Sequence, residues 1–361
     1  MYRHFLISRV FFFSILIFGI GCKDVSHEPP PPKMEEIVVL DTLAFTSKDS
    51  LKSEGLISVE EAKKIIEKEK GFTLFEVSKE KKYAEGHLSG AIQIWRPDYG
   101  SKAGYDYGGM RASREEMEVL LSEKGVKSDD LILIYDIKGS CDAIRLASLL
   151  KIYGHQKVKI VNGGKAAWKI AGFDLTKEVP KSKLKTNFKF SLEKNESGIA
   201  TIEDVKAAIN NPEIILLDTR EIEEYCGEPY IVKGKLYPYK KGAFDAGCIP
   251  SALHLNWSEA VELHDDHRFK CLKDQKYNFE KAGITPDKEI IVYCQSGVRS
   301  AHTAYVLTEI LGYPNVKNYD GSWIEWSYFN KKNGSVAIEK KTSKKEHQQI
   351  YRALKNYLVS K

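Results

Sequence analysis

The sequence predicts an α/β fold that occurs twice, as two domains that each hold a parallel sheet flanked by helices. An internal repeat is the first observation, because residues 125–168 align with residues 283–326 without a gap. The second observation is that short aliphatic segments, such as 131–135 (LILIY) and 289–293 (EIIVY), alternate with helical stretches. Strands that are apolar on both faces and separated by helices are typical of a parallel sheet covered on both sides.

The upstream parts of the two copies also correspond. Ser58 and Thr201 each precede an acidic residue by three positions, which is typical of a helix N-terminus. Short apolar strands follow at 72–77 and 214–218, and then the similar segments GHLSGAIQI (86–94) and GCIPSALHL (247–255). We therefore expect domains at 55–177 and 198–335, joined by a lysine- and serine-rich linker at 178–197. Residues 336–361 are expected to be a basic tail, helical and packed on its own domain or else drawn to a membrane surface.

Length and composition limit the classes of function. The 361 residues suffice for two domains, and 42% hydrophobic and 29% charged residues are ordinary for a globular protein. The net charge of +5 favours small anionic ligands over nucleic acid, which requires a concentrated basic patch. We therefore expect no nucleic-acid partner. The sequence leaves the oligomeric state open, and a monomer is the expectation.

The N-terminus predicts export. Arg3, His4 and Arg9 precede an apolar run at 10–20, which is shorter than the roughly 20 residues of a membrane span, so residues 1–22 indicate a signal peptide. The run ends in GIGC (19–22), which resembles the lipobox of bacterial lipoproteins and predicts lipidation of Cys22. Residues 23–54 would then be a proline-rich linker, and the protein would be anchored on the periplasmic side of a bacterial cell envelope. Glycine stands where the lipobox usually has leucine, so a plain signal peptide or an uncleaved anchor is the alternative.

The six cysteines do not make a disulfide scaffold. Without Cys22 an odd number remains, so at least one thiol is free or pairs with another molecule. The sequence leaves open which of Cys141, Cys226, Cys248 and Cys271 pair.

Cys294 is the candidate nucleophile. It stands at the end of the strand 289–293, and a loop with Gly297 and Arg299 separates it from a helix that begins near Ser300. Open parallel sheets bind ligands at the carboxyl ends of their strands, and the N–H groups of such a loop favour a thiolate. The alternative is a small buried side chain at a strand end.

Four motifs carry a family resemblance. The motifs CQSGVRS (294–300), DTR (218–220), GCIPSA (247–252) and DGSWIEW (320–326) together resemble a tandem-domain rhodanese, a thiosulfate sulfurtransferase, over roughly residues 55–330. In that family the first domain is usually inactive, and here Asp136 occupies the place of Cys294 while Cys141 falls opposite Arg299. Glu76 and Ser78 likewise stand opposite Asp218 and Arg220. The first domain is then expected to wall one side of the cleft.

The resemblance implies a ping-pong reaction without a cofactor. Cys294 would take the outer sulfur of thiosulfate as a persulfide, release sulfite, and pass the sulfur to cyanide or a thiol. The amides of Gln295, Ser296, Gly297 and Val298 would hold the anion, and Arg299 and Arg220 would bind the donor oxyanion. Asp218 would orient the loop and Trp323 would line the pocket, whereas Trp326 matches Trp168 and is expected in the core. For Arg220 the alternative is a surface ion pair with Glu223 or Glu224.

Two other features have no predicted role in the chemistry. His302 lies on the helix after the loop, where a satisfied or exposed histidine is expected rather than a general base. The cluster HDDH (264–267) has metal-ligand residue types, but its spacing is typical of a solvated loop, and we expect no metal site.

Three other functions share features with this sequence. A related phosphatase class has one more residue between cysteine and arginine than the four here, so this loop is too short for phosphate. Enzymes for 3-mercaptopyruvate resemble CG-S/T-G-V-T in this loop, and Gln295 and Arg299 depart from that pattern, which favours thiosulfate. A non-catalytic envelope module that binds a partner or senses sulfur compounds is the third possibility.

Overall fold

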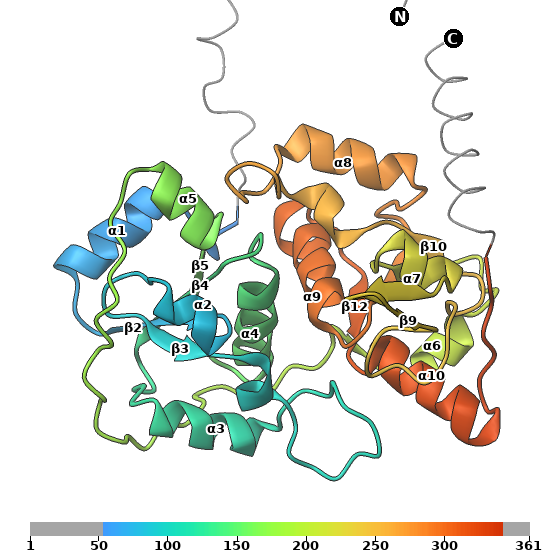
Figure 1. Ribbon diagram of the computed structural model, residues 1–361, viewed down its shortest axis with the longest axis horizontal. Coiled ribbons are helices and arrows are strands. Elements are labelled where there is room, and N and C mark those ends of the chain that lie inside the picture. Colours follow the sequence, from blue (N-terminus) through green and yellow to red (C-terminus); the bar gives the residue numbers. More distant parts are fainter. Residues whose placement is uncertain (1–52, 342–361) are drawn as a thin grey trace, which may run out of the picture. The chain divides into compact units, whose positions relative to one another are not determined.

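The computed structural model describes residues 53–341 (Figure 1). The predicted signal peptide at 1–22, with Cys22, and the linker at 23–54 except for its last two residues lie outside the described residues, as does the tail from 342 onward. Between residues 53 and 341, no helix has both the length and the apolar character that a membrane span requires.

The first domain is a five-stranded parallel sheet covered by helices on both faces. Its strands are β1 (Leu56–Ile57), β2 (Phe72–Val77), β3 (Ile92–Ile94), β4 (Leu131–Asp136) and β5 (Val158–Val161), in the order β1-β5-β4-β2-β3. Its helices are α1 (Val59–Lys68), α2 (Glu80–Ala84), α3 (Arg114–Glu123), α4 (Cys141–Ile152) and α5 (Gly164–Ile170). Alternate residues of β4 belong to separate cores: Ile132 and Ile134 pack with α3 and α4, and Leu133 and Tyr135 with α1 and α5. This is why the strand is apolar on both faces.

The second domain repeats this arrangement. Its strands β6 (Ile199–Ala200), β7 (Ile214–Asp218), β10 (Leu253–His254), β11 (Glu289–Tyr293) and β12 (Val316–Tyr319) form a parallel sheet in the order β10-β7-β11-β12-β6. Its helices are α6 (Ile202–Ala208), α7 (Ile222–Cys226), α8 (Leu272–Lys281), α9 (Val298–Tyr305) and α10 (Ser322–Asn333). Read from β6, the strand order is that of the first domain, so the α/β fold predicted from the repeat is confirmed.

One insertion distinguishes the second domain. Residues 227–246 lie between α7 and the GCIPSA segment, whereas only Glu85 separates α2 from Gly86 in the first copy. The insertion contains an antiparallel hairpin of β8 (Tyr230–Val232) and β9 (Lys235–Tyr237). The sequence does not predict this hairpin, because strands of three residues are too short to show a periodicity.

The connecting segments pack against the domains. Within 178–197, Phe188 and Phe190 are buried in the core with α3 and α4. After α10, the backbones of Cys248 and Glu339 exchange two hydrogen bonds of 2.9 Å. Trp326 also donates its indole N–H to the carbonyl of Ala337. Residues 336–341 therefore pack on the second domain, whereas they are expected in the tail from the sequence.

Candidate active site

The loop with Cys294 leaves the end of β11 and leads into α9. Tyr293 pairs in register with Asp218 at the end of β7, so two neighbouring strands of the parallel sheet end at the site. Gly297 caps α9 with a φ of 75°, and a Cβ there would lie 2.7 Å from the carbonyl oxygen of Asp320. Glycine is therefore required both by the backbone conformation and by the close approach of the 320–322 segment.

Ser322 holds this loop, and its role is not among those expected from the sequence. Its Oγ accepts hydrogen bonds from the N–H groups of Cys294 (3.2 Å) and Gly297 (3.0 Å) and donates to the carbonyl of Tyr319 (2.7 Å). Ser322 has a φ of 52°, and its counterpart in the first copy is Gly164 with a φ of 51°. Comparing the two copies could have pointed to Ser322, because a serine stands where the other copy has glycine. A non-glycine residue with this backbone conformation is typical of a side chain that makes specific contacts.

The environment of Cys294 favours the thiolate. The side chain is only 1% exposed, and burial by itself raises the pKa of the thiol. The Arg299 guanidinium, the Ser300 hydroxyl 3.5 Å from Sγ, and the backbone N–H groups of Ser300 and Ser296 outweigh burial, so the pKa of Cys294 lies below its ordinary value of 9.0. The sequence predicts Ser300 only as the start of a helix, and the structure adds its hydroxyl to the site.

In the first domain, the corresponding loop surrounds a carboxylate with backbone N–H groups. The Asp136 carboxylate, at the place of Cys294, accepts four hydrogen bonds of 2.7–3.1 Å from the backbone N–H groups of Lys138, Ser140, Asp142 and Ala143. The repeat aligns Lys138 with Ser296 and Asp142 with Ser300, whose N–H groups stabilise the Cys294 thiolate. The loop therefore directs backbone N–H groups at a central side chain in both copies, and only the second copy has a cysteine at this place.

Arg299 is neutralised by a glutamate. Its guanidinium forms a two-pronged pair with Glu224, with Nη1–Oε2 at 2.6 Å and Nη2–Oε1 at 2.9 Å. Burial alone would raise the pKa of Glu224. The positive charges of Arg299 and Lys240 outweigh burial and lower this pKa to about 2. Glu224, one of the two glutamates expected as partners for Arg220, thus pairs with the arginine of the cysteine loop.

Arg220 is buried, not exposed. Its Nε and Nη2 contact both Asp218 carboxylate oxygens at 2.6–3.0 Å, and Nη2 also donates to the Gly247 carbonyl at 2.7 Å. The side chain is 1% exposed and its guanidinium lies 4.5 Å from the ring centre of Trp323. The alternative of a surface ion pair is therefore wrong. Asp218 accepts the backbone N–H of Arg220 (2.9 Å), so it orients the end of β7 and not the cysteine loop itself.

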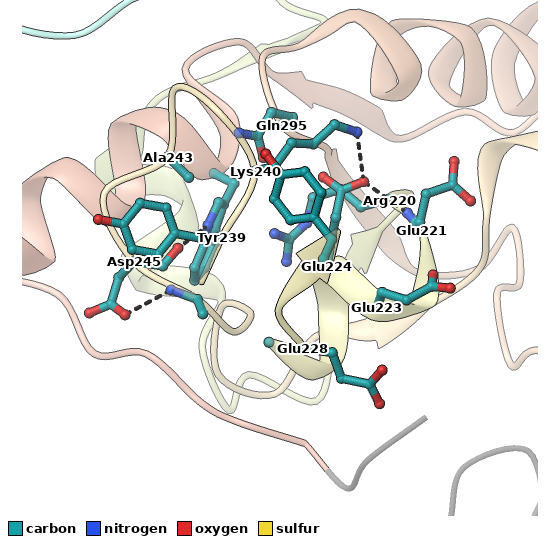
Figure 2. A pocket seen from close by; sticks show the side chains of 14 residues that line it. Arg220, Glu221, Glu223, Glu224, Glu228, Tyr239, Lys240, Ala243, Asp245 and Gln295 are labelled. Carbon is teal, nitrogen blue, oxygen red and sulfur yellow. Dashed lines mark hydrogen bonds and ion pairs between the residues drawn. The ribbon is translucent and has the colours of Figure 1, made fainter. Parts of the chain in front are cut away.

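A pocket of about 320 Å³ lies beside the loop, and Arg220, Gln295 and Trp323 are among its lining residues (Figure 2). The inserted residues 227–246 contribute most of the remaining wall. Trp323 therefore lines the pocket as expected, and Trp326 is fully buried in the core.

The first domain covers the cysteine loop from the other side. Arg145 on α4 donates to the Gly297 carbonyl at 3.3 Å and pairs with Asp320 at 2.5 Å. A Cβ at Gly109 would lie 2.9 Å from Ser296 Cβ, so the 101–111 segment lies directly on the loop. The first domain therefore contacts the cysteine loop, whereas all the residues that line the pocket belong to the second domain.

The other candidate side chains take no part in the site. Cys141, Cys226 and Cys248 are buried free thiols and Cys271 is a partly buried one. Burial lowers the pKa of the fully buried His302 to about 3, so this imidazole is neutral and is not exposed. Among residues 53–341, no three His, Cys, Asp or Glu side chains are grouped as a metal site would require.

Comparison with known proteins supports this description. The family model described as a rhodanese-like domain matches residues 58–171 and 201–328. A "Putative thiosulfate sulfurtransferase" of Saccharopolyspora erythraea is 36% identical over 245 residues, which cover 68% of this chain and 83% of the relative. The "Putative thiosulfate sulfurtransferase SseA" of Mycobacterium bovis is 34% identical, with 68% and 78% covered. The sulfur carrier protein TtuD of Thermus thermophilus is 36% identical over 251 residues, with 68% and 83% covered.

A solved structure shows the same fold. The anaerobic ergothioneine biosynthesis enzyme of Chlorobium limicola, in complex with trimethyl histidine, matches with a TM-score of 0.66 and 23% identity, over 81% of this chain and 72% of that one. Two matched domains and sulfurtransferase relatives converge on one conclusion. The chain belongs to the rhodanese family of sulfurtransferases, as a tandem of two rhodanese-like domains.

Proposed function

We propose that the second domain moves the outer sulfur of thiosulfate, through a persulfide on Cys294, to a thiophilic acceptor such as cyanide or a thiol. The observation that carries this proposal is a cysteine with a lowered pKa in a loop whose other copy binds a carboxylate through four N–H groups. Relatives named as thiosulfate sulfurtransferases support the choice of donor.

Both half-reactions balance without a cofactor. The Cys294 thiolate attacks the outer sulfur of thiosulfate, the S–S bond of the donor breaks, and sulfite leaves with the bonding electrons. The cysteine then carries a persulfide anion. In the second half-reaction cyanide attacks the terminal sulfur, thiocyanate forms, and the Cys294 thiolate is regenerated.

The cysteine loop is suited to the persulfide anion. In the first copy the two carboxylate oxygens of Asp136 reach beyond Cβ and are bonded by N–H groups on each side. A persulfide on Cys294 likewise extends beyond Cβ by two heavy atoms. We therefore assign the amides of Ser296, Val298 and Ser300, which correspond to Lys138, Ser140 and Asp142, to the stabilisation of this charge. The N–H of Gly297 is bonded to Ser322 and, contrary to the expectation from the sequence, does not contribute.

The two arginines take different parts in this proposal. Arg299 stabilises the thiolate and would need to share its guanidinium between Glu224 and the sulfonate oxygens of the donor. Arg220 uses Nε and Nη2 for Asp218 and Gly247, which leaves Nη1 for an oxyanion. A guanidinium whose N–H groups are already hydrogen-bonded binds a further anion more weakly than a free guanidinium does. We therefore expect Arg220 to act mainly by positioning the end of β7.

Sulfite release from thiosulfate, in the presence of cyanide, tests the proposal. We expect activity in the wild type and in a Cys271→Ser variant, since Cys271 lies outside the site, and no activity in Cys294→Ser. Running 3-mercaptopyruvate in parallel identifies the donor. Equal activity of Cys294→Ser and wild type would show that Cys294 is not the nucleophile. Turnover of 3-mercaptopyruvate but not of thiosulfate would show that 3-mercaptopyruvate is the donor.

We also propose that the chain is exported and lipid-anchored through Cys22 in the envelope of its bacterium, because of the sequence before that residue. Cell fractionation with a Cys22→Ala variant tests this. The wild type is expected in the membrane fraction and the variant outside it, whereas equal distributions would exclude the anchor.

A further inference from the structure

We infer that Arg145, a residue of the first domain, is a positioning residue for the chemistry of Cys294 in the second domain. By holding the carbonyl of Gly297, it aims the N–H of Val298 at the sulfur. The inference rests on the proposed function, because it concerns the N–H groups to which that function assigns the persulfide. It is carried by the contacts of Arg145, by the geometry of one peptide group and by a difference between the two copies.

The Arg145 side chain reaches from α4 into the second domain and joins two segments there. It is 4% exposed, and its Nη1 lies 2.5 Å from a carboxylate oxygen of Asp320 and donates to the carbonyl of Gly297 at 3.3 Å. Asp320 belongs to the turn between β12 and α10, and Gly297 belongs to the cysteine loop. A guanidinium that contacts a carboxylate and a carbonyl fixes the distance between the segments that carry them.

The Gly297 carbonyl and the N–H of Val298 belong to one peptide group. Because this group is planar and trans, the two bonds point in opposite directions, so a donor that holds the carbonyl also orients the N–H. In the first copy the corresponding N–H, that of Ser140, donates to the carboxylate of Asp136 at 3.0 Å. Arg145 therefore orients one of the N–H groups that surround the central side chain of the loop.

Three donors share the Gly297 carbonyl, each at 3.3 Å. They are the guanidinium of Arg145, the side-chain amide of Asn318 and the backbone N–H of Ala301 in α9. A charged donor forms a stronger hydrogen bond than a neutral one, and of the three donors only Arg145 comes from the first domain. Without Arg145 the carbonyl keeps two neutral partners, so we expect a less well aligned loop and not a collapsed one.

In the first copy, an amide stands at the place of the Asp320 carboxylate. The repeat places Asn162 opposite Asp320. The Oδ1 of Asn162 accepts the backbone N–H of Phe269 at 3.1 Å, and an oxygen of Asp320 accepts that of Arg111 at 3.0 Å. A neutral amide therefore makes the same backbone contact between the domains, so this contact requires no charge. The negative charge of Asp320 serves its ion pair with Arg145.

The second domain has no arginine at the place that corresponds to Arg145. The repeat places Thr303 there, and its hydroxyl donates to the Arg299 carbonyl within the same helix at 3.4 Å. Gly139, in the loop of the first copy, lies beside the neutral imidazole of His302. A buried ion pair has a desolvation cost that neutral contacts avoid. Of the two loops, the one with the cysteine thus receives the charged contact, as expected of a contact that serves the chemistry.

The pKa of the Cys294 thiol, measured in the full-length protein, tests the inference. It is obtained from the pH dependence of alkylation by iodoacetamide, followed by mass spectrometry of the Cys294 peptide. The variants are Arg145→Gln and Arg145→Met/Asp320→Asn. The double variant removes both buried charges together, so it leaves neither unpaired, and a shift in it does not reflect the loss of a net charge. Arg114→Gln is the control, because Arg114 also donates from the first domain to a carbonyl, that of Phe190 at 3.1 Å, which lies outside the cysteine loop.

We expect the pKa of Cys294 to rise by about 0.5–1 unit in Arg145→Gln and in the double variant, because this is the effect of weakening one hydrogen bond to the thiolate. The control is expected to leave the pKa unchanged. Arg145→Lys keeps a cation beside Asp320 and should recover part of the shift. Urea unfolding of each variant separates this effect from a loss of stability, which by itself does not move the pKa.

An unchanged pKa of Cys294 in the folded double variant, or an equal rise in the control, would overturn the inference. If Arg145→Gln does not fold, the double variant decides alone. Alkylation requires no sulfur donor, so the result is independent of sulfur transfer. Failure of the wild type to take up sulfur from thiosulfate would overturn the proposed function, whereas the alkylation would still decide whether Arg145 positions the loop.

Discussion

Arg299 and Arg220 show how residues of one type differ at the site. Both were expected to bind an oxyanion, and the sequence could place both near Cys294 because each follows the end of a neighbouring strand. It could not assign their partners. Glu224 lies close to Arg220 in sequence but pairs with Arg299, because α7 turns this carboxylate toward the cysteine loop, while Asp218 and Gly247 occupy Arg220.

The two members of the Arg299–Glu224 pair should shift the reactivity of Cys294 in opposite directions. Arg299→Gln removes the main positive charge near the thiolate and raises the pKa of Cys294, so the rate of alkylation by iodoacetamide at pH 7 should fall about tenfold or more. Glu224→Gln removes the opposing negative charge, so alkylation below neutral pH should become faster. Mass spectrometry restricted to the Cys294 peptide measures both rates. A change in the same direction for both variants would contradict the assigned electrostatics.

At the scale of elements, the turn between β12 and α10 positions the cysteine loop. The N–H groups of Trp323 and Ile324 donate to the carbonyls of Cys294 (2.9 Å) and Gln295 (3.1 Å), and Ser322 accepts from the same loop. The motif DGSWIEW was recognised from sequence, but the role of its serine was not. Sequence spacing shows that two loops meet at one sheet edge and does not show which hydroxyl bonds which amide.

Two substitutions of Ser322 should differ in stability. Ser322→Ala leaves two buried N–H groups without Oγ and keeps the left-handed backbone, so the free energy of unfolding should fall by about 2 kcal/mol or more. Ser322→Gly loses the same contacts but relieves the backbone strain, as Gly164 does in the first copy, and should recover about 1 kcal/mol. Urea unfolding measures both values. A glycine variant less stable than the alanine variant would contradict this account of the turn.

For the whole molecule, the repeat made most of the fold predictable. The alignment of 125–168 with 283–326 places β4 opposite β11, α4 opposite α9 and β5 opposite β12, and both sheets have the same strand order. The packing between the copies was less predictable. Arg145 of the first domain contacts Asp320 and Gly297 of the second domain. Aligning the two copies shows which residues correspond, but it does not show which residues of one copy contact the other.

His302 makes the stability of the folded chain depend on pH. The ring stacks on Phe269 and meets Trp257 edge-on, both with ring centres 5.1 Å apart. Its pKa of about 3 lies below the ordinary 6.5, so between these values the unfolded chain binds a proton that the folded protein does not. The contribution of neutral His302 to the free energy of unfolding is therefore complete above pH 6.5 and is lost as the pH falls toward 3.

The variant His302→Phe should reduce this loss. We expect the wild type to lose up to ~4 kcal/mol more stability than the variant between pH 7 and pH 3, because a pKa difference of one unit corresponds to about 1.4 kcal/mol. Asp136, whose pKa is raised to about 6, changes stability in the opposite sense, but it does so in both proteins and cancels in the comparison. Urea unfolding across this pH range measures the free energy of unfolding of both proteins. If this free energy changed equally with pH in the wild type and the variant, His302 would not be the cause of the loss.

The central claim is that Cys294 in the second copy accepts sulfur and that the first copy cannot. Its most direct test is the mass of the intact protein after brief treatment with thiosulfate, followed by location of any added sulfur on a peptide. The account predicts one added sulfur atom on the peptide with Cys294 in the wild type and in Cys271→Ser, and none in Cys294→Ser. Sulfur added to a different cysteine, or no sulfur added at all, would contradict it.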